Sequence, residues 1–104
     1  SPKDSDNELI EKIFKRIPIS GRRPQQYLAE IRRCLGDPQN DLKMLRNYFV
    51  FAFGKTVAMQ YCSRIESGSV DKIAKDLEDN WQFYAGIVNT QDSAVEMHIF
   101  EQAA

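Results

Sequence analysis

The stretch Tyr48-Phe49-Val50-Phe51-Ala52-Phe53 decides the fold class, because its aromatic and β-branched side chains would suit either a buried strand or a helix. No second run of strand-like composition occurs in the chain, and a lone strand would leave its backbone groups without partners. Upstream, Leu42 and Leu45 lead into the stretch with the spacing of a core-facing helical stripe. We therefore predict that 48–53 is helical.

Toward the N-terminus, the boundaries of three helices follow from capping residues. Asp37 as N-cap and Pro38 as the first helical residue predict the start of the helix that contains 48–53. A second helix is expected to begin at Pro24 and to run to Gly36, a residue typical of helix ends. Apolar residues at helical spacing predict a first helix over 7–17.

Toward the C-terminus, the same reasoning predicts further helices. Gly54 indicates a break, after which an apolar stripe predicts a fourth helix over 57–65. Ser69 can cap a fifth and longest helix, whose apolar face continues to Val88. A short terminal helix is expected over 93–101, where a capping-box spacing opens the segment.

These segments predict an all-α fold: a compact bundle of about five to six helices in a single domain. The 104 residues fit one hydrophobic core, and 42% of them are hydrophobic. We expect a disordered tail over 1–6, the bundle over 7–101 and a frayed end over 102–104. The residues expected at the centres of the apolar stripes are Ile13, Ile31, Leu45, Phe49, Ile65, Leu77 and Trp81.

The chain has two cysteines, Cys34 and Cys62, and each stands in a helix-like apolar pattern. We predict buried, reduced thiols in an intracellular, cytoplasmic or nuclear protein, with a disulfide as the less favoured alternative. One histidine and two distant cysteines do not make a zinc site. No apolar run is long enough to span a membrane, and the start resembles neither a signal peptide nor an initiating segment. We expect the chain to belong to a larger protein.

No pattern points to catalysis. His98 stands alone near the expected frayed end, without a nucleophile or an orienting group beside it in sequence. Gly54-Lys55-Thr56 echoes the end of a phosphate-binding loop, but Phe49 stands where the first glycine of that motif belongs. We therefore predict no enzyme activity, no metal site and no small-molecule cofactor.

Charge is segregated along the chain, although the net charge is only −1. Residues 12–64 contain eleven basic and three acidic side chains, whereas 65–104 contain two basic and eight acidic ones. Such asymmetry indicates an electrostatically steered partner. The alternative is that the two blocks neutralise each other within the bundle through surface ion pairs.

The densest basic cluster surrounds the second helix, and arginine pairs offer planar donors for carboxylates or phosphates. Phe83 lies about 200° around a helix from Trp81, so the two side chains cannot share one narrow core stripe. The alternative is a helix buried on both sides. The predicted partner-binding residues are Arg22, Arg23, Arg32, Arg33, Lys43, Arg46 and Phe83.

The sequence therefore predicts a non-catalytic protein–protein interaction domain, an adaptor or scaffold module of a larger protein. Its partner would be an acidic segment of another protein or a second copy of the chain, and exposed aromatic side chains would anchor the contact. The alternative is an RNA-binding module, in which arginines contact phosphates and Tyr27 or Tyr48 stacks on a base. A sequence pI near 5.8 argues against that alternative.

Overall fold

The first four residues of 48–53 lie in a helix in the computed structural model, which describes residues 2–36 and 41–89. No strand occurs among the described residues, so the predicted all-α class is confirmed. The described residues form seven helices rather than five to six, because two predicted helices are each divided in two. The helices are α1 Pro2–Arg16, α2 Pro24–Arg32, α3 Lys43–Phe51, α4 Lys55–Met59, α5 Cys62–Ser67, α6 Val70–Asp79 and α7 Trp81–Asn89.

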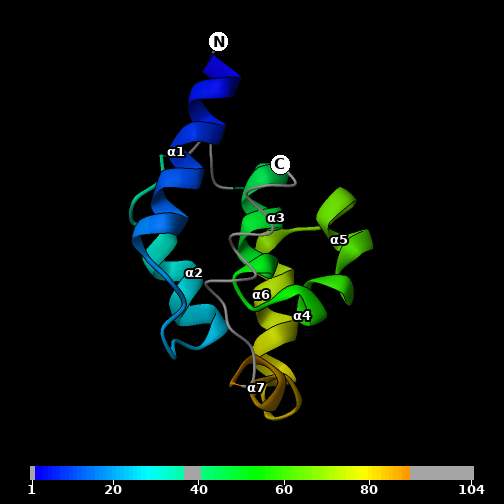
Figure 1. Cartoon of the computed structure of the whole chain (residues 1–104). Helices are drawn as coiled ribbons and strands as arrows, with labels where there is room; N and C mark the ends of the chain where they lie inside the picture. The colour runs from blue at the N-terminus through cyan, green and yellow to red at the C-terminus, as the bar shows by residue number, and fades with distance from the viewer. Residues whose placement is uncertain (1, 37–40, 90–104) are drawn as a thin grey trace.

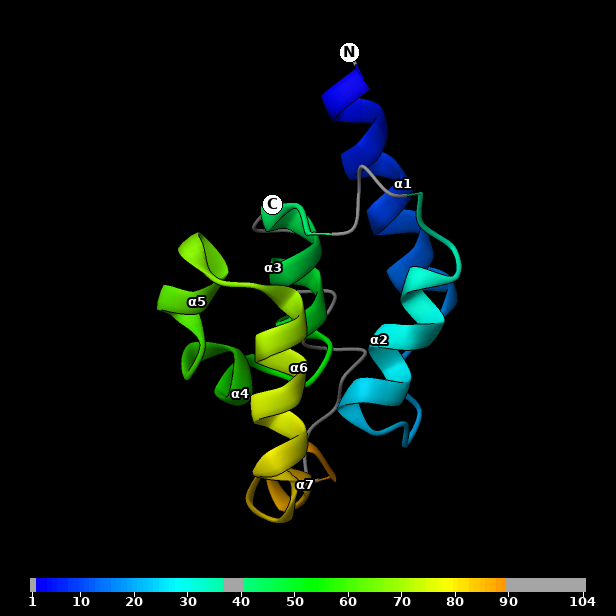
Figure 2. The same ribbon diagram turned by 180° about the vertical axis from the view of Figure 1, so that it is seen from behind.

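Helix α3 lies in the middle of the bundle, where it packs against α1, α4, α5 and α6 (Figure 1). The view from behind shows α2 beside α6, with α7 turned away at one end of the molecule (Figure 2). Helix α7 contacts α4 and α6 at one end of the bundle. Much of its surface is therefore left toward solvent.

The core forms around α3, as the periodicity predicts. Tyr27 connects three parts of it: its ring stacks on Phe49, meets Phe53 edge-on, and its hydroxyl donates a hydrogen bond to the carbonyl of Ile17 at 2.6 Å. Trp81 is only half-buried, with its ring edge-on to Phe53 at 6.0 Å. The other predicted core residues are all buried: Ile13, Ile31, Leu45, Phe49, Ile65 and Leu77.

Asn80 divides the predicted fifth helix, so the expectation of one continuous helix from Ser69 to Val88 is wrong. The Asn80 side-chain amide donates a hydrogen bond to the carbonyl of Asp76 at 2.9 Å, and its backbone leaves the helical region. A short polar side chain that bonds nearby backbone competes with the regular helical ladder. The chain therefore restarts as α7 in a new direction.

Other helix boundaries also differ from the prediction. Helix α1 begins at Pro2 rather than at residue 7, and α2 ends at Arg32 rather than at Gly36. Helix α3 begins at Lys43, whereas the expected cap at 37–38 lies outside the described residues, as does the predicted helix over 93–101. The break at Gly54 is confirmed, since this residue has a φ of 100° and precedes α4.

The prediction that both cysteines are buried is wrong. Cys34 and Cys62 are exposed, and neither forms a disulfide. Cys34 follows the end of α2, and Cys62 opens α5 beyond a turn, so neither continues the apolar stripe on which the prediction rested. The expected absence of a disulfide between them agrees with the structure.

Candidate partner-binding surfaces

Ion pairs join both ends of the contact between α2 and α6. Arg23, just before α2, reaches Glu78 with 2.6 Å between Nη2 and Oε2. At the other end, Arg32 presents both terminal nitrogens to the carboxylate of Asp71, with 2.7 Å between Nη2 and Oδ2. The start of one helix thus meets the end of the other, and the two run antiparallel.

Glu78 also caps α2 from a neighbouring helix. Its Oε1 accepts a hydrogen bond from the backbone amide of Gln25 at 3.0 Å, where the residue in the N-cap position, Arg23, makes no side-chain cap bond. At the far end, the hydrogen bond from Arg32 holds the pKa of the Asp71 carboxyl below its usual range. The ionised Asp71 carboxylate therefore stabilises the contact between the two helices.

The remaining residues of the predicted basic surface differ in their surroundings. Arg22 forms an ion pair with Glu30 and donates a hydrogen bond to the carbonyl of Pro18 at 2.8 Å. Lys43 contacts Glu66 with 2.7 Å between nitrogen and oxygen. These partners come from the chain itself.

Arg46 lies inside the protein rather than on the surface. Its side chain is among the buried groups, and its Nε donates a hydrogen bond to the carbonyl of Ile65 at 2.9 Å. Its Nη1 donates to the Asp41 carbonyl at 2.6 Å and lies 3.2 Å from the carboxylate of the same residue. Arg46 therefore holds the start of α3 against the end of α5 and is not placed to touch a partner.

Within the described part of the chain, ion pairs connect the basic block of the sequence with the acidic one. They are Arg23–Glu78, Arg32–Asp71, Lys43–Glu66 and Arg64–Asp76. These contacts within the bundle therefore neutralise part of the positive charge of one block with part of the negative charge of the other. Whether the same arginines also bind a partner stays a prediction.

Arg33 is the basic residue of the predicted set that is exposed and has no ion pair with any described residue. It lines a shallow groove between α2 and α6 with a volume of about 480 Å³. The lining of the groove also includes the small apolar side chains of Ala29 and Ala74 and the ion pair between Arg32 and Asp71. The groove offers one uncompensated positive charge.

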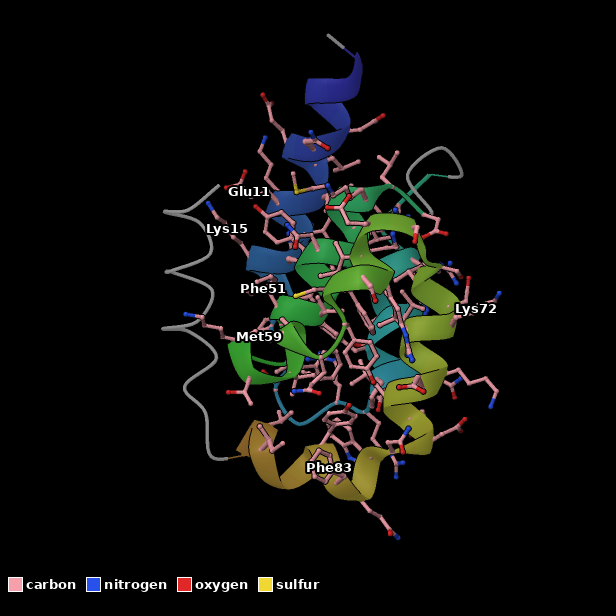
Figure 3. All side chains as sticks on the ribbon, turned by 90° about the vertical axis from the view of Figure 1, so that its right-hand side faces the viewer. Glu11, Lys15, Phe51, Met59, Lys72 and Phe83 are labelled. Carbon is pink, nitrogen blue, oxygen red and sulfur yellow. The ribbon has the colours of Figure 1, made fainter. Side chains whose placement is uncertain are left out.

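A second candidate surface lies on α4 and α7. Phe83 of α7 is 68% exposed and Met59 of α4 is 63% exposed. Trp81 packs on the core residue Phe53, whereas Phe83 is exposed, as the angular separation predicts. Phe83 lies on α7 at the lower end of the view in Figure 3. Helix α7, Trp81–Asn89, contains no charged residue at all.

The α4 part of this surface was not anticipated. Lys55 and Met59 lie four residues apart in α4 and are both exposed. The sequence signal that could have revealed it is the absence of any acidic residue over 42–65, together with the uncharged run of α7. An exposed helix normally carries charged residues on its solvent side, so their absence marks a candidate contact surface.

Among residues 2–36 and 41–89 no cluster of potential ligands could hold a metal ion. None of the helices in this part of the chain is long and apolar enough to cross a membrane. Comparisons with protein-family models, with curated proteins and with solved structures each find no match.

Proposed function

We propose that this chain is a non-catalytic protein-binding domain whose contact surface is centred on Phe83. The observation that carries the proposal is the exposure of 68% of this phenylalanine on a helix without charged residues. Exposed aromatic groups among uncharged neighbours are typical of the centres of protein interfaces. Burial of the ring by a partner would supply the apolar contact that it lacks in the isolated chain.

The Phe83 side chain stands on a well-anchored support. Its ring lies 5.2 Å from that of Tyr84, which in turn lies 6.0 Å from the buried ring of Tyr61. On the other side of the helix, Trp81 contacts the core residue Phe53. A helix held at several aromatic contacts presents its exposed residue with little further loss of conformational freedom, which favours binding.

Gly86 leaves a flat strip beside the ring. It follows Phe83 by three residues, is exposed, and a side chain built there would meet no atom within 4 Å. Glycine in a helix costs about 1 kcal/mol relative to alanine. Close approach of a partner to the backbone beside Phe83 would account for the absence of a side chain.

A site-specific photo-crosslink tests the proposal. We would place p-benzoylphenylalanine at position 83 and, in a matched control, at position 72, since Lys72 is also exposed but lies on α6 at the opposite edge of Figure 3 from Met59. In extract, the expected result is a discrete protein adduct from position 83 and none from position 72. Excess wild-type chain should compete for the adduct, whereas an equally stable Phe83→Ser chain should not.

Equal labelling from the two positions, or competition by the Phe83→Ser chain, would contradict the proposal. Circular dichroism melting of each variant provides the stability control. Because Phe83 is already exposed, the serine variant should melt within a few degrees of the wild type.

A further inference from the structure

The surface around Met59 and Phe83 has a charge character of its own. Helices α3, α4 and α7 contain no aspartate or glutamate, and no acidic residue occurs anywhere over 42–65. Helices α4 and α7 contact each other, and their neighbouring turns are joined by the Tyr61–Tyr84 ring contact. The two helices that present the exposed apolar side chains therefore have no carboxylate of their own.

Lys55 is the uncompensated charge of this surface. It is exposed and makes no ion pair with any described residue. In contrast, the other exposed basic residues of 42–65 have partners: Lys43 contacts Glu66, and Arg64 contacts Asp76 at 3.2 Å. Residues four apart share one face of a helix, so Lys55 stands one turn before Met59 on the same side of α4.

Resting on the proposed function, we infer that Lys55, Met59 and Phe83 form a docking surface for an acidic amphipathic helix of a partner protein. The apolar side of such a helix would cover Met59 and Phe83, and a carboxylate on its flank would meet Lys55. A basic helix would find no carboxylate on α3, α4 or α7 and would be repelled by the lysine.

The all-α fold favours a helical rather than an extended segment of the partner. An extended peptide commonly binds by adding a strand to a sheet edge, and the described part of the chain has no strand to offer one. Helix surfaces instead recognise side chains that recur every three or four residues along a partner helix.

Two designed peptides of about 15 residues test the inference, each with leucines spaced three and four apart and with either glutamate or lysine at the remaining positions. Their affinities for the full chain would be measured by fluorescence anisotropy. We expect the glutamate peptide to bind about tenfold more tightly than the lysine peptide. Lys55→Glu should remove or invert this preference, and Phe83→Ser should weaken both peptides.

Lys72→Glu is the matched control, because it changes the net charge equally at an exposed position on α6. It should alter the affinity for the glutamate peptide by less than about twofold. Equal effects of Lys55→Glu and Lys72→Glu, or no binding of either peptide, would overturn the inference. If the photo-crosslink at position 83 nevertheless forms, the proposed function stands and only the acidic partner is wrong.

The same variants also test whether a lipid membrane or a second copy of the chain binds this surface instead. Co-sedimentation with phosphatidylserine vesicles that is lost in Lys55→Glu and Phe83→Ser, without a preference between the peptides, would assign the surface to lipid. Sedimentation velocity that shows a dimer dissociated by Phe83→Ser would assign it to a second copy of the chain. Either result would overturn the partner helix.

Discussion

The hydroxyl of Tyr61 donates a hydrogen bond to Oδ2 of Asp76 at 2.6 Å, and this contact ties the turn after α4 to α6. Arg64 approaches the same carboxylate oxygen at 3.2 Å, and its guanidinium lies 5.1 Å from the centre of the Tyr61 ring. The tyrosine ring itself is buried. This cluster supports α4 and, through the ring of Tyr84, the helix that carries Phe83.

The cluster predicts loss of stability at alkaline pH. Burial, followed by the hydrogen bond to Asp76, raises the pKa of Tyr61 above its usual value of 10.0. Since the folded state favours the neutral hydroxyl, its contribution is fully present below that usual value and is lost as the pH rises above it. We expect the free energy of unfolding, measured with urea, to fall above about pH 10 and to fall less steeply in Tyr61→Phe.

At neutral pH, Tyr61→Phe should cost about 1–3 kcal/mol, because Asp76 loses its hydroxyl donor and keeps only the contact with Arg64. Tyrosinate absorbance provides a direct check, since ionisation of Tyr61 should accompany unfolding. Ionisation of this residue in the folded protein near its usual pKa, with equal alkaline slopes for both proteins, would show that the hydrogen bond has no such effect. Burial also raises the pKa of Tyr27, which accounts for an alkaline slope that remains in the variant.

Arg46 predicts a large effect at neutral pH. Its replacement by methionine would leave the Ile65 carbonyl without this donor and would leave the Asp41 carboxylate with the backbone amide of Val70 alone. A buried acceptor that loses its donor typically costs about 1–3 kcal/mol, and the exposed Asp41 carboxylate adds little to this cost. Chemical denaturation should show a loss of that size for Arg46→Met and of less than about 0.5 kcal/mol for Arg33→Met, the exposed control. Similar losses for the two variants would contradict the structural role of Arg46.

The periodic features of the sequence were sufficient to predict the fold class. Around Phe49 and Leu77, apolar side chains recur at helical spacing, and both are fully buried. The division at Asn80 could not be predicted in this way, because the apolar pattern passes through it without interruption. There, a local hydrogen bond from one side chain to the backbone outweighs the periodicity.

The candidate site was predictable only in part. Phe83 could be identified because its angle from Trp81 depends on helix geometry alone. The surroundings of Arg32 and Arg46 could not, because their partners Asp71 and Ile65 are distant in sequence and are brought near by packing. A count of charges measures how many ion pairs are possible but not which side chains form them.

Gly86 predicts opposite effects on stability and on binding. Gly86→Ala should raise the free energy of unfolding by about 1 kcal/mol, because alanine is the better helix former and the added methyl group meets no atom. If a partner lies against the strip beside Phe83, the same substitution should lower the yield of the crosslink from position 83. Thermal melting and adduct yield would be compared on one preparation. A stabilised variant with an unchanged yield would place the partner away from Gly86.

Substitutions of Arg32 and Arg33 distinguish a basic residue that stabilises the fold from one that is available to bind a partner. Arg32→Glu would set two carboxylates against each other at Asp71 and should cost about 1 kcal/mol, because the pair is partly exposed. Arg33→Glu should leave stability within about 0.5 kcal/mol, since this side chain has no ion pair with any described residue. Urea denaturation of the two variants measures this difference.

The same two variants decide between protein and RNA as the ligand of the α2 surface. Phosphate binding weakens steeply with salt, so a labelled short RNA would be titrated at about 50 mM and about 200 mM salt. Because intramolecular carboxylates already occupy Arg23 and Arg32, we expect no RNA affinity that rises steeply as salt is lowered. An affinity of that kind, lost in Arg33→Glu while the crosslink at position 83 persists, would establish a separate RNA surface in the groove between α2 and α6. Loss of the crosslink in Arg33→Glu, without loss of stability, would instead extend the protein-binding surface to that groove.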